Sequence, residues 1–79
     1  MNTHRVLMLV AARRHASEGT GRQIRERASL SMYDVAQTIG VGEPTVSRWE
    51  RGLARPTGDA AVRWTELLDK LATAVAPTS

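Results

Sequence analysis

The stretch that decides the fold is residues 31–52, which read SMYDVAQTIGVGEPTVSRWERG. Ser31 and Asp34 have the spacing of a capping box, in which each of two side chains bonds to the backbone amide of the other residue at the start of a helix. Gly40 can adopt the left-handed backbone conformation that ends such a helix. The apolar residues between them recur at helical spacing: Val35, Ala36 and Ile39. The pattern therefore predicts a short amphipathic helix over residues 31–39.

A second short helix is predicted over residues 43–51, after a connection of only about three residues. Pro44 is compatible with its first turn, because the amides there have no intrahelical partners. Gly52 supplies the left-handed residue that stops it, and Val46 and Trp49 face inward, against the preceding helix. Two short helices joined by a tight turn containing glycine form a helix-turn-helix, whose second helix enters the major groove of DNA.

The pattern outside this unit predicts three more helices. The first runs from a Thr3 cap to about Ala16, and a strand over residues 5–10 is the alternative. Thr20 and Gln23 have the spacing of another capping box, which opens a helix to about residue 28. The last helix is expected over residues 59–74 and contains Trp64, which we expect in the core together with Trp49. The fold class is therefore all-α, a bundle of about five helices.

A chain of 79 residues forms a single domain. We divide it into an N-terminal helical extension over residues 1–18, the helix-turn-helix domain over residues 19–75 and a disordered tail over residues 76–79.

Composition excludes several classes of protein. The sequence has no cysteine, and its two histidines, His4 and His15, are expected at the surface, so no metal site is predicted. No nucleophile–base–acid arrangement is present, so we expect neither an enzyme nor a cofactor. The apolar run over residues 6–12 is too short to span a membrane, and Arg13 follows where a signal peptide would have its cleavage site. We expect a cytoplasmic, nucleoid-associated protein.

Positive charge is concentrated in the first three quarters of the chain. Residues 1–58 hold nine arginines against five acidic residues, whereas residues 59–79 hold two basic and three acidic ones. This distribution suits a surface that faces phosphate groups. Four arginines outside the motif are expected to be solvated instead: Arg13, Arg14, Arg22 and Arg27.

Residues 41–52, VGEPTVSRWERG, resemble the recognition-helix pattern of the Cro/C1-type (XRE) helix-turn-helix family of repressors, and Arg55-Pro56 falls at that family's basic-Pro loop. The resemblance covers about residues 23–71. It implies a lambda-repressor-like fold that binds double-stranded DNA. The chain departs from the family pattern at Met32, which replaces a glutamine that can contact phosphate, and at Gly42, which replaces a serine or threonine cap. Glu43 is a third departure, because an acid repels phosphate.

The resemblance also assigns roles to individual residues. The base-facing positions are Glu43, Pro44, Ser47 and Arg48. Within them, Arg48 suits guanine and Glu43 suits the amino group of cytosine. The phosphate-facing positions are Ser31, Thr45, Arg51 and Arg55. Arg25 and Glu50 fall where the family has a buried ion pair. For Tyr33, a phosphate contact and a cover over the core both remain open.

These features favour a sequence-specific transcriptional regulator, expected to be a repressor that inserts helix 43–51 into the major groove. Because one recognition helix covers only half a site, we expect a homodimer. Its interface would be residues 4–16, which could instead brace the bundle, or the last helix. The alternative function is that of an antitoxin or adaptor whose main partner is a protein, with DNA binding for autoregulation.

Overall fold

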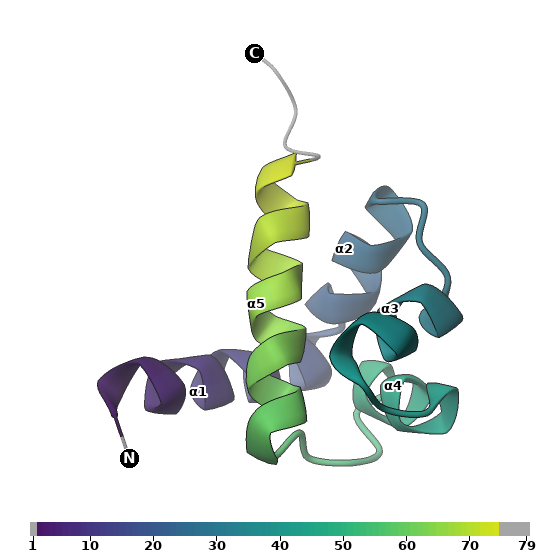
Figure 1. The fold of residues 1–79 in the computed structure, drawn as a ribbon. Helices are drawn as coiled ribbons and strands as arrows, with labels where there is room; N and C mark the ends of the chain where they lie inside the picture. Colours follow the sequence, from purple (N-terminus) through teal and green to yellow (C-terminus); the bar gives the residue numbers. More distant parts are fainter. Residues whose placement is uncertain (1, 75–79) are drawn as a thin grey trace.

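The computed structural model describes residues 2–74, which form five α-helices and contain no strand (Figure 1). The helices are α1 (Thr3–Glu18), α2 (Thr20–Arg27), α3 (Met32–Ile39), α4 (Glu43–Glu50) and α5 (Gly58–Ala74). The all-α prediction is confirmed, and the alternative of a strand over residues 5–10 is wrong. The tail expected over residues 76–79 lies outside the described residues.

The start of the fold differs from the sequence prediction in its caps. Asn2, rather than Thr3, caps α1, and its side-chain oxygen accepts a hydrogen bond of 2.7 Å from the amide of Arg5. Gly19 has a left-handed backbone and joins α1 directly to α2, so the capping box predicted at Thr20 does not form. The Thr20 hydroxyl contacts the Nδ1 atom of His15 instead, at 2.7 Å.

The ends of the two central helices are as predicted. The Ser31 side chain accepts from the Asp34 amide, and the Asp34 carboxylate accepts from the Ser31 amide, each at 3.0 Å. Gly40 ends α3 and Gly52 follows α4, both with a positive φ angle. These ends hold the connection between α3 and α4 to three residues, so the second helix must cross close to the first.

The core is built around Trp64 of α5, whose side chain is completely buried. The ring of Trp49 lies 5.0 Å from it, centroid to centroid. Gly21 of α2 packs against the Trp64 ring so closely that a Cβ atom there would lie 2.6 Å from it. Both tryptophans are therefore core residues, as predicted.

The first helix is part of this core. Figure 1 shows α5 standing across α1, and α1 contributes three buried residues to the core: Leu9, Ala12 and Ala16. The hydroxyl of Thr65 in α5, also fully buried, donates to the backbone carbonyl of Met8 at 3.1 Å. Residues 3–18 thus brace the bundle, which was one of the two roles expected of them.

Candidate nucleic-acid interface

Helix α4 has one face in the core and one in solvent. Val46, Trp49 and Glu50 are buried. The predicted base-facing positions lie on the other side: Glu43, Pro44 and Arg48 are exposed, and Ser47 is partly exposed. The outward face thus combines an acid, a ring, a hydroxyl and a guanidinium group, a set that offers both acceptors and donors to base edges.

The buried ion pair that the resemblance implied is present and anchors α4. The Arg25 guanidinium donates to Glu50 through two bonds, Nε to Oε2 at 2.6 Å and Nη2 to Oε1 at 3.0 Å. Its Nη1 atom donates to the carbonyl of Leu30 at 2.8 Å. The side chains of Arg25 and Glu50 are only 12% and 4% exposed, respectively. Hydrogen bonding to the Glu50 carboxylate raises the pKa of Arg25 above its ordinary value. The bonds of Arg25 therefore hold three elements in one arrangement: α2, α4 and the loop that precedes α3.

The start of α3 is exposed and carries free polar groups. Ser31 uses its oxygen as an acceptor within the capping box, which leaves its hydroxyl hydrogen available to a ligand. The hydrogen bonds from Ser31 lower the pKa of Asp34. Tyr33 is 56% exposed and does not cover the core, whereas Met32 packs against it. A phenol and a helix N-terminus thus face solvent at this end of α3.

Two of the remaining predicted positions lie in the loop after α4, and one lies in α4 itself. Arg51 and Arg55 are exposed, and Thr45, on the first turn of α4, is partly exposed. The loop is shaped by a bond of 2.8 Å from the Leu53 amide to the Arg48 carbonyl and by Pro56, which is buried. Its two arginines place positive charge in the chain directly after α4.

Three side chains have roles that sequence reasoning missed. Arg63 of α5 donates from Nε to the carbonyl of Ile39 at 2.9 Å and so satisfies the end of α3. Arg13, expected in solvent, is half-buried and donates from Nε to the carbonyl of Pro56 at 3.3 Å. His15, also expected at the surface, is half-buried with its ring edge-on to Trp64, and burial lowers its pKa. All three contacts join segments at least 24 residues apart or depend on the core, so no local signal could have found them.

The other arginines expected in solvent are exposed. Arg14 pairs with Glu18 and Arg22 pairs with Glu26, each one helical turn away and at 3.5–3.6 Å. Arg27 is exposed as well. Surface pairs of this kind contribute little to stability.

Two negative findings concern residues 2–74. No helix among them is long and apolar enough to cross a membrane. They also hold no group of three side chains that could bind a metal ion.

Comparison with known proteins gives one match. A family model described as helix-turn-helix matches residues 22–73, from the third residue of α2 almost to the end of α5. No curated protein and no solved structure shows a significant match. The matched segment contains the ion pair, both helices of the motif and the loop that follows them. The chain belongs to the Cro/C1-type (XRE) helix-turn-helix family of DNA-binding regulators.

Proposed function

We propose that this chain is a sequence-specific regulator that inserts α4 into the major groove of duplex DNA, with repression as its effect on transcription. The observation that carries the proposal is the two-sided character of α4. The buried side, including Glu50, is fixed to the bundle, and the exposed side presents four side chains from two successive turns. A regulator bound in this way covers its site and excludes polymerase from it.

Within this proposal, Arg48 and Glu43 read opposite strands of a base pair or of neighbouring pairs. The Arg48 fork suits the O6 and N7 acceptors of guanine, and the Glu43 carboxylate accepts from the amino group of cytosine. Ser47 and Pro44 lie between them on the same face and limit how far the helix can enter the groove. Since Glu43 repels phosphate, the approach of α4 depends on cations at its flanks.

The phosphate contacts come from both flanks of α4. On one side, Ser31, Tyr33 and the free amides of the first turn of α3 suit a phosphate oxygen. On the other, Arg51 and Arg55 follow α4, and Thr45 lies on its first turn. Such contacts fix the register of the helix on the duplex and carry no sequence information.

A dimer would double the site, and α1 offers the surface that supports one. Val6, Leu7 and Val10 are 43%, 57% and 49% exposed, respectively, and lie within two turns of the same helix. Exposed apolar clusters of this kind are typical of protein interfaces. We propose that α1 both braces the bundle and pairs with a second copy of the chain.

The first experiment selects binding sites from a random duplex pool with the purified chain at about 150 mM salt, where non-specific phosphate binding is weak. We expect enrichment of two-fold-related half-sites about 10 base pairs apart. Arg48→Ala should relax the preference for guanine at one position of each half-site, at a cost of about 1–3 kcal/mol. Lys70→Ala, which removes an equal charge from the exposed side of α5, is the control and should leave the motif unchanged. A pool that shows no enrichment would refute sequence-specific binding.

The exposed side chains of α1 also support the second candidate function, that of an antitoxin or adaptor with a protein partner. The two functions differ in solution. A regulator that pairs through α1 sediments as a dimer, and Leu7→Ser converts it to a monomer. An adaptor sediments as a monomer with and without this substitution, because its apolar surface binds a different protein and not a second copy of the chain.

A further inference from the structure

The arginines of the first two helices fall into two groups. Four of them have a carboxylate partner within ion-pair distance: Arg5 with Asp59, Arg14 with Glu18, Arg22 with Glu26 and Arg25 with Glu50. Arg13 lies between two of these on α1, yet no carboxylate within residues 2–74 lies within ion-pair distance of it. Arg55 of the loop is also without a carboxylate in that range. Arg27 of α2 is likewise without a carboxylate partner within residues 2–74, but of these three arginines only Arg13 and Arg55 line one common groove.

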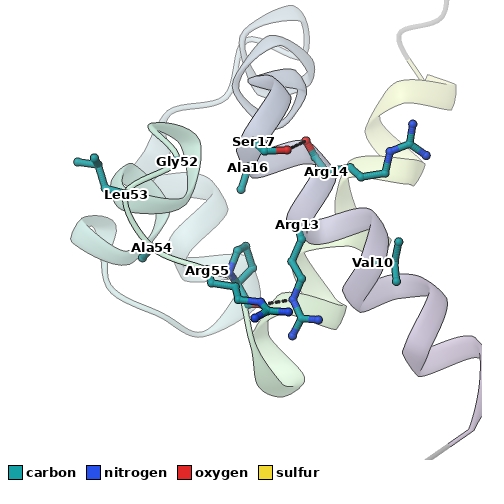
Figure 2. Close-up of a pocket in the computed structure, with 10 residues that line it drawn as sticks. Val10, Arg13, Arg14, Ala16, Ser17, Gly52, Leu53, Ala54 and Arg55 are labelled. Atoms are coloured by element: carbon teal, nitrogen blue, oxygen red, sulfur yellow. Dashed lines mark hydrogen bonds between the residues drawn. The ribbon is translucent and has the colours of Figure 1, made fainter.

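The structure brings these two arginines to one groove. The Nε atom of Arg13 donates to the carbonyl of Pro56, the residue after Arg55. Figure 2 shows the side chains of Arg13 and Arg55 reaching the same end of the space between α1 and the loop, while Arg14 points away from the loop. The bond occupies only Nε of Arg13, so both of its terminal nitrogens are left to donate. Two like charges held at one place favour an anion between them.

The surroundings strengthen that preference. Arg13 and Arg55 line an open groove of about 620 Å³ between α1 and the loop, and no acidic residue lines it. Arg14 also lies at this groove, but its guanidinium group pairs with Glu18. Most of its other walls are apolar: Val10, Ala16, Leu53, Ala54 and Pro56. A cleft with charges of one sign and walls of low dielectric constant concentrates the electric field and attracts counterions. The groove opens to solvent, so an extended polyanion can reach it.

We propose that Arg13 and Arg55 form a single binding site for a phosphodiester group of the DNA backbone. Two guanidinium forks can grip the non-bridging oxygens of one phosphate. The site lies between α1 and the loop that directly follows α4, so it would hold the duplex next to the base-reading helix. Arg13 lies outside residues 22–73, which the family model matches, so α1 adds to the interface a contact that the matched segment alone does not supply. This inference rests on the proposed function.

The test uses the full chain and a labelled duplex of mixed sequence, because a phosphate contact is independent of sequence. Fluorescence anisotropy gives the affinity between 50 and 200 mM NaCl. Each phosphate contact contributes about 0.9 to the slope of log affinity against log salt. We expect Arg13→Gln to lower the magnitude of that slope by about 0.9. The affinity that this variant loses between 50 and 200 mM NaCl should then be about 3.5-fold smaller than the affinity that the wild type loses. Arg14→Gln removes the same charge from the neighbouring position and should leave the slope unchanged.

Two further variants separate charge from structure. Arg13→Lys keeps the charge and should restore the slope of the wild type. If it behaves like Arg13→Gln, the role of Arg13 is to position the loop, and the proposal is overturned. In an Arg55→Gln background, Arg13→Gln should have a smaller effect than in the wild type, because the two share one phosphate. Circular dichroism of each variant confirms that it is folded.

The outcomes also separate this inference from the proposed function. If the wild type binds DNA and Arg48→Ala loses specificity, but Arg13→Gln matches Arg14→Gln, the function stands and the phosphate site is refuted. If the wild type binds no duplex at all, both the function and the site are refuted.

Discussion

The ion pair between Arg25 and Glu50 makes a quantitative prediction about stability. Glu50→Gln keeps the size of the side chain and removes its charge, which leaves the Arg25 cation buried among groups that only partly compensate it. The side chains of Arg25 and Glu50 are 12% and 4% exposed, and the guanidinium group donates three hydrogen bonds. Removing one partner of a pair buried to this degree costs about 3–5 kcal/mol. A domain of this length has a total stability of about 4–12 kcal/mol, so a large part of it depends on one carboxylate.

Urea unfolding measures this cost. The intrinsic fluorescence of Trp49 and Trp64 reports on the core, and circular dichroism at 222 nm reports on the helices; coincident transitions justify a two-state analysis. Glu26→Gln is the matched control, because Glu26 is exposed and pairs with Arg22 at 3.5 Å. It should cost no more than about 0.5 kcal/mol.

Replacing both partners of the pair tests the reason for that cost. In Arg25→Met with Glu50→Leu, no charge is left buried, and such replacements are often neutral or stabilising. The Leu30 carbonyl loses its donor, at about 1–3 kcal/mol. We expect the double variant to be more stable than Glu50→Gln alone. A cost of less than about 1 kcal/mol for Glu50→Gln, or a double variant less stable than the single one, would refute the reasoning.

Three further predictions follow from local features of the fold. Gly21→Ala improves helix propensity by about 1 kcal/mol, but its Cβ would lie 2.6 Å from the Trp64 ring. Because overpacking costs about 1–3 kcal/mol, the midpoint of thermal unfolding should fall. A higher midpoint would contradict this packing. Burial lowers the pKa of His15 below its ordinary value of 6.5, so the unfolded chain takes up a proton first as the pH falls. The free energy of unfolding should then decrease as the pH falls below about 6.5 and level off below the pKa of the folded state. Urea titrations from pH 7.5 to 5 should show this decrease in the wild type and in His4→Gln. The decrease should be absent from His15→Gln. Ser31→Ala removes the cap of α3 and should cost about 1 kcal/mol in a urea titration, whereas Ser17→Ala, at an exposed position of α1, should be neutral within error.

The sequence predicted those parts of the fold that local chemistry determines. The capping box of Ser31 and Asp34, the glycines at positions 40 and 52, and the inward spacing of Val46 and Trp49 each act within one or two turns. Because these signals agree with one another, the bounds of α3 and α4 were predicted to within a residue. The same helical period placed Glu43 and Arg48 on the exposed face. Whether they contact bases stays a prediction.

The parts that the sequence did not predict depend on distant contacts. The spacing of Thr20 and Gln23 is correct for a capping box, but Gly19 both ends α1 and caps α2, so Thr20 is already the first residue of the helix. Arg13 and His15 look like ordinary surface residues until the loop and Trp64 are brought beside them. Such contacts are determined by how the helices pack, which a single sequence does not reveal.

The pairing of α1 with α5 has a consequence for how the chain folds during synthesis. The bond between Thr65 and Met8 joins residues 57 positions apart, and the contact between His4 and Glu66 joins residues 62 positions apart. Helix α1 leaves the ribosome first, and its apolar side is therefore covered only after α5, the last helix, has been synthesised. Closing so long a loop carries an entropic cost that local helix contacts do not, and it slows folding. We expect nascent chains that end before α5 to expose Leu9 and Trp49 and to be targets for chaperones and proteases, so that only a chain containing both helices becomes a stable binder of DNA.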